Sequence, residues 1–378
     1  MIRNLELEKF SSFNKLNIDF SSGINIIIGE NGTGKTQLLK AAYSLASLSF
    51  KNPKPENQKE QEEAFTEGFK RIFLPEELKI GKLSKCSESN CSIIKADFIE
   101  KMSYDKKIKF NFSTRVQTLK LDTKDSTKDD LYSMEPIFIP TKEVLSLYTG
   151  LKNNPENKEA FKTIFDESYF DLCNQLSRDS KDEFEPRIEV FLEEIVNKIQ
   201  GKFLFNNTVN FTTGKYVPYA KSTIESDKSK EGKRYFDEDS ADKLSTHMVA
   251  EGFRKLGVLH RLMENETLVP KKSGTLFWDE PESNMNPKLM RLIVEVLMEL
   301  AKAEQQIILT THDYVLLKWF DLLSNESVHI RYHILSRDKE SGDIVYNFTN
   351  NYNEIEPNPI DDAFEYLVDE EIVKDMGL

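Results

Sequence analysis

The chain has 378 residues, 39% apolar content and a formal net charge of −13. This composition supports a large folded core, and no run approaches the ~18 consecutive apolar residues of a membrane-spanning helix. The negative charge argues against a surface that binds nucleic acid over its whole extent. Three cysteines in so long a chain predict free thiols in a reducing compartment, so we expect a soluble cytoplasmic protein.

The first 50 residues predict three strands, a glycine-rich loop and a helix. Apolar alternation favours strands over residues 2–8, 16–20 and 24–28, separated by turn residues. The sequence GENGTGKT follows at residues 29–36, and a helix is expected from there to about residue 48.

The next segment predicts a polar insertion and then an antiparallel lobe. Residues 51–90 open on a stretch dense in Lys, Glu, Gln and Asn, which is typical of an exposed or mobile insertion. Alternating runs at 92–98, 107–112 and 115–121 favour an antiparallel sheet. A short apolar run between two prolines, at residues 136–140, predicts a buried strand.

Residues 151–243 read as an insertion into a discontinuous core that comprises residues 1–150 and 244–378. Helical spacing of apolar residues over 154–200 predicts a mainly helical insertion, which a polar surface loop ends at 221–243. The core then resumes with a helix, a strand, a second helix and a second strand at 244–265, 275–278, 286–303 and 306–310.

The C-terminal part predicts one further strand and an acidic tail. In residues 328–335, alternation places His329, Arg331 and His333 on the wet face of a strand and the apolar residues on the other. Residues 354–378 hold nine acidic side chains and one lysine and favour a solvated tail. The alternative is a short helix that docks on a basic partner through an apolar stripe of Phe364, Leu367, Ile372 and Met376.

The loop at residues 29–36 is a complete phosphate-binding motif between a strand and a helix. Its glycines let successive backbone N–H groups surround a polyphosphate at a helix N-terminus. Lys35 is predicted to neutralise the β- and γ-phosphates of ATP, and the Thr36 hydroxyl to bind Mg²⁺. The predicted nucleotide contacts are Asn31, Gly32, Thr33, Gly34, Lys35, Thr36 and Gln37.

Two later strand ends carry polar groups that complete such a site. The apolar run before Asp279 and Glu280 predicts that Asp279 holds Mg²⁺ and that Glu280 acts on the attacking water; the alternative is a pair of solvated turn residues. A second buried run ends at His312, for which we predict a role at the γ-phosphate.

These motifs, in this order, resemble those of the ABC-type ATPases, and within them the SMC, RecF and OLD branch. The resemblance implies an α/β P-loop NTPase fold with a mixed central sheet, an antiparallel β lobe and a helical insertion. It also implies a signature at the start of a helix, which Ala250 and Gly252 match best here, with alanine in place of the usual serine. A plain amphipathic helix is the alternative. Glu143, after the strand at 136–140, is the residue that we assign to the Q-loop and to Mg²⁺.

The family resemblance further implies a homodimer or larger homo-oligomer in which ATP lies between two heads. The chain resembles the small ATPase subunits of bacterial phage-defence systems such as PARIS and Septu, which control a separately encoded nuclease or toxin. The alternative is a RecF-like ATPase of recombination or repair, which leaves DNA open as a partner. A transporter motor is disfavoured because the signature is altered and the N-terminus is rich in strands.

Overall fold

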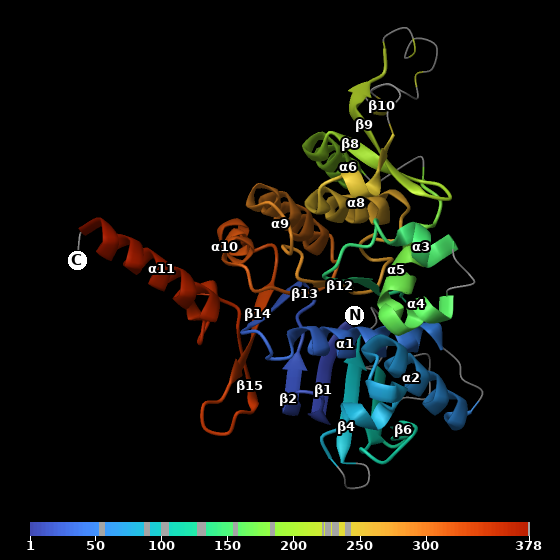
Figure 1. Ribbon diagram of the computed structural model, residues 1–378, viewed down its shortest axis with the longest axis vertical. Coiled ribbons are helices and arrows are strands. Elements are labelled where there is room, and N and C mark those ends of the chain that lie inside the picture. Colours follow the sequence, from blue (N-terminus) through green and yellow to red (C-terminus); the bar gives the residue numbers. More distant parts are fainter. Residues whose placement is uncertain are drawn as a thin grey trace.

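The computed structural model describes most of the chain and divides it into three sheets with surrounding helices (Figure 1). The described residues are 1–52, 57–86, 91–99, 106–126, 134–153, 158–181, 186–220, 223, 228, 234–238 and 243–376. Among the helices in these ranges, none is both long enough and apolar enough to cross a membrane.

The central sheet has six strands in the order β15-β14-β3-β13-β12-β7. The strands are β3 (Ile24–Gly29), β7 (Ile137–Ile139), β12 (Leu276–Asp279), β13 (Ile307–Thr310), β14 (Ile330–Arg337) and β15 (Ile344–Thr349). All neighbours pair in parallel except β14 and β15, which are antiparallel. The mixed central sheet that the sequence predicts is therefore confirmed.

This sheet separates two apolar clusters, because alternate residues of a strand face opposite sides. Ile26 and Trp278 belong to the cluster on one face, where three helices pack. Ile27 and Phe277 belong to the cluster on the other face, which the helix after the phosphate loop shares with the N-terminal strands. The helices are α1 (Lys35–Lys51) on the second face and α8 (Glu251–Glu264), α9 (Pro287–Lys302) and α10 (Tyr314–Leu323) on the first.

The predicted antiparallel lobe is present beside α1 (Figure 1). It has the order β2-β1-β4-β5-β6, and β4 coincides with the predicted run at 92–98. Its strands are β1 (Ile2–Phe10), β2 (Phe13–Asp19), β4 (Ser92–Phe98), β5 (Lys106–Phe112) and β6 (Lys120–Leu121).

The prediction of an exposed polar insertion after α1 is wrong for residues 58–73. They form α2 (Gln58–Phe73). Most of its residues are polar, but its apolar residues recur at helical spacing and form one stripe. Phe65 and Phe69 are fully buried against the antiparallel lobe, where the Phe65 and Phe110 ring centroids lie 4.8 Å apart. The short 3₁₀ helices Glu76–Leu78 and Ile80–Leu83 follow.

The insertion contains strands as well as helices. Its helices are α3 (Tyr148–Asn153), α4 (Lys158–Ile164), α5 (Glu167–Leu176) and α6 (Pro186–Ile199). The sequence analysis missed the sheet formed by β8 (Gly201–Phe205), β9 (Val209–Pro218), β10 (Arg234–Glu238) and β11 (Leu244–Ser245). The loop predicted at 221–243 lies mostly outside the described residues, and its part at 234–238 is strand β10.

The predicted exposure of His333 is wrong. His333 is not on a wet face, because its imidazole is fully buried between side chains of the neighbouring strands β15 and β3 and the Phe20 ring. Its Nδ1 lies 3.0 Å from the Tyr346 hydroxyl and its Nε2 lies 3.1 Å from Asn25 Oδ1.

The cysteines are also not all free thiols. Cys86 and Cys91 form a disulfide, and their Cα atoms lie 6.0 Å apart, within the usual range. Cys173 is free and buried. The cysteine count therefore carries no inference about a reducing compartment.

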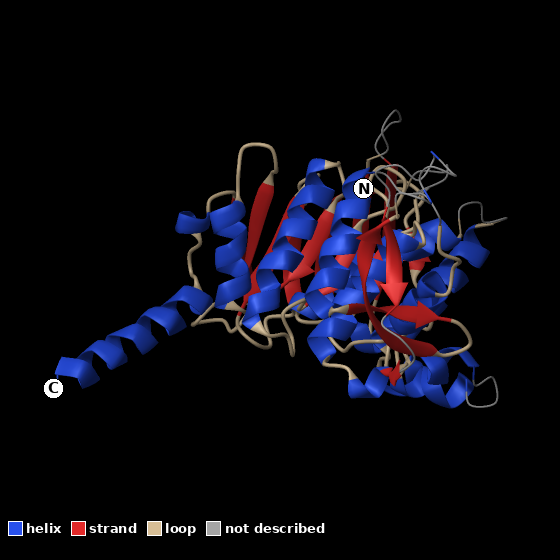
Figure 2. Ribbon diagram, turned by 90° about the horizontal axis from the view of Figure 1, so that it is seen from above, coloured by secondary structure: helices blue, strands red, loops and turns tan. Residues whose placement is uncertain are grey.

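The acidic C-terminal segment is a helix, α11 (Pro359–Met376), that follows the 3₁₀ helix Tyr352–Glu354. It projects away from the body of the molecule in two perpendicular views (Figures 1 and 2). Its first turns contact α10, where the Tyr314 and Phe364 rings stack with centroids 4.1 Å apart.

Replacement of Phe69 by alanine tests the corrected position of α2. We expect Phe69→Ala to lower the free energy of unfolding by about 3–5 kcal/mol, because a buried aromatic ring leaves a cavity. The matched control is Glu63→Ala on the exposed face of α2, with an expected change within about 0.5 kcal/mol. Urea denaturation measures both, and equal effects would show that α2 does not pack on the lobe.

Burial of His333 makes stability depend on pH. Burial, followed by the charge of Arg331, lowers the pKa of His333 to about 3. The unfolded chain takes up this proton near pH 6.5, so the free energy of unfolding falls as pH drops from 6.5 towards 3, by up to about 1.4 kcal/mol per pH unit. His260, whose pKa burial lowers to about 4, contributes in the same window. His333→Gln is expected to lower the dependence of the free energy of unfolding on pH between 3 and 6.5 by the contribution of one bound proton. Urea titrations at several pH values measure this, and an unchanged dependence contradicts it.

Candidate nucleotide-binding site

Three parallel strands of the central sheet, β3, β12 and β13, end at one edge and deliver predicted site residues there. The phosphate loop follows β3, Glu280 follows β12, and Thr311 and His312 follow β13. The register pairs Asp279 with Thr310, so these two residues end their strands side by side. Ligands of open α/β sheets bind at such an edge, outside the carboxyl ends of the strands.

The glycines of the phosphate loop are required by its backbone. Gly34 has φ +90°, and a Cβ there would lie 2.8 Å from the Phe13 ring. A Cβ on Gly29 would lie 2.2 Å from the Leu335 carbonyl oxygen. Gly34 caps α1 without a side-chain hydrogen bond, so backbone N–H groups of the first turn remain for an anion.

Lys35 lies inside this loop. Its ammonium donates to the carbonyl oxygens of Gly29 at 2.7 Å and Glu30 at 3.2 Å. Burial lowers the pKa of Lys35, while Glu280, Asp279 and Glu282 act in the opposite direction. When a nucleotide binds, the ammonium could therefore donate to phosphate oxygens in place of these backbone carbonyls.

Asp279 gathers hydroxyl groups from three other elements. Thr36 Oγ1 lies 3.0 Å from both carboxylate oxygens, and the Thr310 and Thr141 hydroxyls each donate at 2.7 Å. A carboxylate and hydroxyl oxygens are the hard ligands that Mg²⁺ prefers, so Thr36 and Asp279 fit the metal role predicted for them. Thr141 and Thr310 were missed, although both stand at strand ends of the same sheet.

Glu280 and His312 face each other beside Asp279. Glu280 Oε1 lies 3.1 Å from His312 Nδ1, and the Glu280 N–H donates to Thr310 Oγ1 at 3.0 Å. Glu280 has φ +48°, which is uncommon for a residue with a side chain. This left-handed turn gives Glu280 a direction different from that of Asp279, and both carboxylates serve one site.

Glu282 accepts hydrogen bonds from Thr311 and His312, and the sequence analysis gave it no role. Its Oε1 accepts the Thr311 hydroxyl at 2.8 Å and the His312 N–H at 3.1 Å. Burial raises the pKa of Glu282, and among the described residues its Oε2 has no hydrogen-bond partner. The motif that follows β12 therefore fixes the backbone that carries His312.

The predicted signature residues Ala250 and Gly252 lie at the start of α8. Ala250 is exposed and caps α8 without a side-chain hydrogen bond. A Cβ on Gly252 would lie 3.3 Å from side-chain atoms of Met285 and Leu289, which places this turn against the start of α9.

Two predicted contacts have other partners in this structure. Glu143 forms an ion pair with Arg254 at 3.0 Å and accepts the Ser146 N–H, while Thr141 takes the contact with Asp279. Its assignment to Mg²⁺ is thus not supported by its position, because its charge is matched by Arg254. Gln37 accepts a hydrogen bond from Ser11 of the antiparallel lobe.

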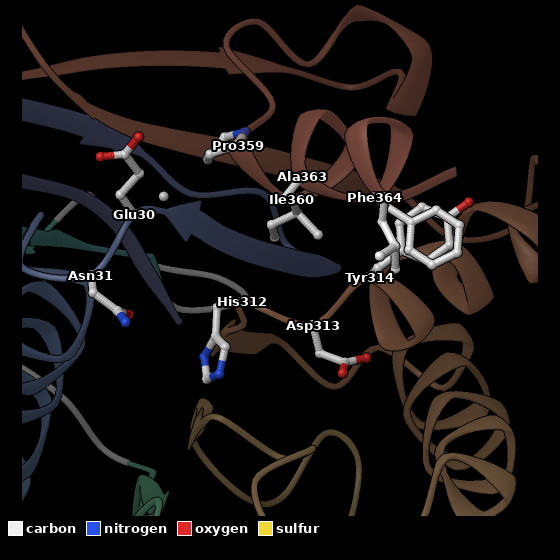
Figure 3. A pocket seen from close by; sticks show the side chains of 11 residues that line it. Glu30, Asn31, His312, Asp313, Tyr314, Pro359, Ile360, Ala363 and Phe364 are labelled. Carbon is white, nitrogen blue, oxygen red and sulfur yellow. The ribbon is translucent and has the colours of Figure 1, made fainter. Parts of the chain in front are cut away.

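A pocket of about 420 Å³ opens beside the loop. In Figure 3, Asn31 lies across this pocket from the Tyr314 and Phe364 rings, and His312 lies between them. The lining residues come from the phosphate loop, the start of α10 and α11, and are Gly29, Glu30, Asn31, His312, Asp313, Tyr314, Pro359, Ile360, Ala363, Phe364 and Leu367.

Comparisons with known proteins give a family for this chain. Residues 24–318 match the family model "AAA domain, putative AbiEii toxin, Type IV TA system". The DNA replication and repair protein RecF of Streptococcus suis (strain 05ZYH33) is 44% identical over 45 residues, which are 12% of each chain. The chain thus covers a small part of the length of this relative.

Two solved structures are similar at low identity. The SmcHead bound to the C-winged helix domain of ScpA has a TM-score of 0.49 and 15% identity, covering 92% of this chain and 97% of that chain. The Smc head domain with an extended coiled coil from Pyrococcus furiosus has a TM-score of 0.49 and 13% identity, covering 98% and 99%.

The phosphate loop after β3, the adjacent carboxylates of Asp279 and Glu280 after β12, and His312 after β13 are the parts of a P-loop nucleotide-binding site. Because the family model spans most of its length, the chain belongs to the AAA-domain family named above.

Removal of the Lys35 charge tests the nucleotide site without disturbing the fold. We expect Lys35→Met to weaken ATP binding roughly 10-fold to 150-fold, because it removes charge-assisted hydrogen bonds to phosphate. Lys15→Met, at an exposed position of β2, is the control and should bind as the unmodified protein does. Titration with a fluorescent ATP analogue measures both; equal affinity of Lys35→Met and the control contradicts the assignment.

Proposed function

We propose that this protein binds and hydrolyses ATP, and that nucleotide-dependent assembly of its heads controls a separate effector in bacterial anti-phage defence. The observation that carries the proposal is the convergence on one sheet edge of Lys35, Asp279 and the Glu280–His312 pair. Each group has a distinct task in phosphoryl transfer to water.

ATP binding is assigned to the loop and its helix. The N–H groups around Gly32 and Gly34 and the Lys35 ammonium hold the β- and γ-phosphates. Thr36 and Asp279 would hold Mg²⁺, which supplies charge neutralisation on the phosphate oxygens when bound.

Hydrolysis is assigned to Glu280 and His312. Glu280 accepts the proton of the attacking water, for which its carboxylate oxygen is partly exposed beside the loop. His312 lies within hydrogen-bond distance of Glu280 and lines the pocket beside Asn31, so it is positioned to contact the γ-phosphate. Glu282 is a positioning residue, since it holds the His312 N–H.

The assembly step rests on the family resemblance, and the packing of the two glycine-containing elements is compatible with it. In one copy, Gly252 packs on Met285 and Leu289, whereas the phosphate loop packs on Phe13 and Leu335. By the family resemblance, the signature of one copy contacts the nucleotide of a second copy, so ATP joins two heads and hydrolysis releases them. Hydrolysis by a single copy is expected to be slow.

The defence role is supported by the family, whose description names an AbiEii toxin and a type IV toxin–antitoxin system. The identity to RecF supports the alternative, a DNA-binding ATPase of repair, over only 45 residues. The net charge of −13 disfavours the alternative, because DNA contact then needs a local basic patch.

A variant that binds ATP without hydrolysing it separates these possibilities. We expect Glu280→Gln to lose roughly 100-fold to 10,000-fold in hydrolysis rate, because the proton acceptor is removed. On addition of ATP and Mg²⁺, light scattering should show the mass of Glu280→Gln rising from one chain to two, while the mass of Lys35→Met should stay that of one chain. An unchanged mass of Glu280→Gln on addition of ATP rules out the ATP-joined dimer.

Two further arms separate the biological roles. Duplex DNA that co-migrates with the ATP-bound Glu280→Gln protein supports the repair role. Absence of DNA binding, together with phage resistance of cells that is lost in Lys35→Met, supports control of a defence effector. If wild type and Lys35→Met restrict phage equally, the proposed use of ATP in defence is wrong.

A further inference from the structure

Helix α11 exposes apolar side chains around its whole circumference. Seven large apolar residues expose between 38% and 69% of their surface, and they are Phe364, Tyr366, Leu367, Val368, Ile372, Val373 and Met376. Only the start of α11 is anchored, through Ile360 and through the stacked Tyr314 and Phe364 rings. So much exposed apolar surface is typical of a helix that another chain covers.

The anchored end of α11 is continuous with the nucleotide site. Ile360, Phe364 and Leu367 form one wall of the pocket whose other lining residues include Asn31 and His312 (Figure 3). Any chain that approaches the γ-phosphate side of this site therefore also meets the first turns of α11.

The signature face offers an apolar residue of matching size. Met248 ends the 3₁₀ helix Thr246–Met248, two residues before Ala250, and exposes 73% of its surface. A methionine side chain is unbranched and adapts to irregular apolar pockets.

Charge is complementary between the two surfaces. Helix α11 carries seven acidic residues and one lysine. Lys288 and Arg291 are exposed on the first turns of α9, which pack against Gly252 through Leu289. Two copies of α11 repel each other, whereas Lys288, for which the described residues provide no acidic partner, attracts α11; Arg291 is paired with Glu295 at 2.7 Å.

We propose that α11 of one copy docks on the signature face of a second copy, and that Met248 of the second copy enters the pocket formed by Ile360, Phe364 and Leu367. This inference rests on the proposed ATP-joined dimer and names a second contact in it. Within one copy the contact does not form, since α11 points away from the rest of the molecule in both views (Figures 1 and 2). The added apolar contact makes the dimer depend on α11 as well as on ATP.

Neighbouring residues of α11 provide a matched pair for the test. Leu367 and Tyr366 expose 62% and 67%, but only Leu367 lines the pocket. In the Glu280→Gln background with ATP and Mg²⁺, we expect Leu367→Glu to raise the dimer dissociation constant about tenfold or more. Tyr366→Glu, which adds the same charge one residue away, should change it less than about twofold. Analytical ultracentrifugation measures both constants.

Disulfide cross-linking tests the pairing itself. The double variant Met248→Cys with Leu367→Cys, in the Glu280→Gln background and with a mild oxidant, should give a species of twice the chain mass only when ATP is present. The double variant Met248→Cys with Tyr366→Cys should give little of it.

The outcomes separate this inference from the proposed function. If Glu280→Gln dimerises with ATP, but Leu367→Glu behaves as Tyr366→Glu does and the first pair does not cross-link, the α11 contact is wrong and the ATP-joined dimer stands. If Glu280→Gln does not dimerise, both fall. Loss of dimer in Leu367→Glu together with the ATP-dependent cross-link supports the inference.

Discussion

The Asp279 carboxylate is the interaction on which the site depends. It accepts hydrogen bonds from Thr36 at the start of α1, from Thr310 at the end of β13 and from Thr141 after β7. Each hydrogen bond to a charged acceptor contributes about 1.5–3 kcal/mol. Together they fix the start of α1 against the ends of β7, β12 and β13. The phosphate loop lies between β3 and α1, so its position relative to Glu280 is fixed by the same carboxylate.

The parallel sheet makes this convergence possible, and the chain departs from regular geometry only where the site needs it. Asp279 and Glu280 are adjacent in sequence, and in a strand they would face opposite sides. The φ of +48° at Glu280 ends the alternation. The cost of this conformation, of order 1–3 kcal/mol, is offset by surrounding contacts, among them the Glu280 N–H to Thr310 and the Lys255 ammonium to the Glu280 carbonyl.

Most of the site could be predicted because its signals are local. The phosphate loop is contiguous, and β12 and β13 are short apolar runs that end in polar residues. The hydrogen bond from Thr141 to Asp279 and the ion pair of Glu143 with Arg254 each join residues more than 100 positions apart. No local sequence pattern predicts such contacts. The buried faces of α2 and of His333 were missed for a related reason. Whether a polar helix or a half-polar strand is exposed depends on what tertiary packing places against it, here the antiparallel lobe for α2 and the flanking strands for His333.

The altered signature connects the nucleotide site with α11. In the proposed dimer, a serine at position 250 would present a hydroxyl to the γ-phosphate of the second copy, and Ala250 presents none, so only backbone N–H groups at the start of α8 remain. A helix N-terminus favours an anion by about 0.3–1 kcal/mol at an exposed position, which is little compared with the cost of joining two proteins. An ATP-joined dimer of this chain therefore needs contact area beyond the nucleotide. The exposed apolar surface of α11, which begins in the pocket that His312 lines, is where the described part of the chain offers that area.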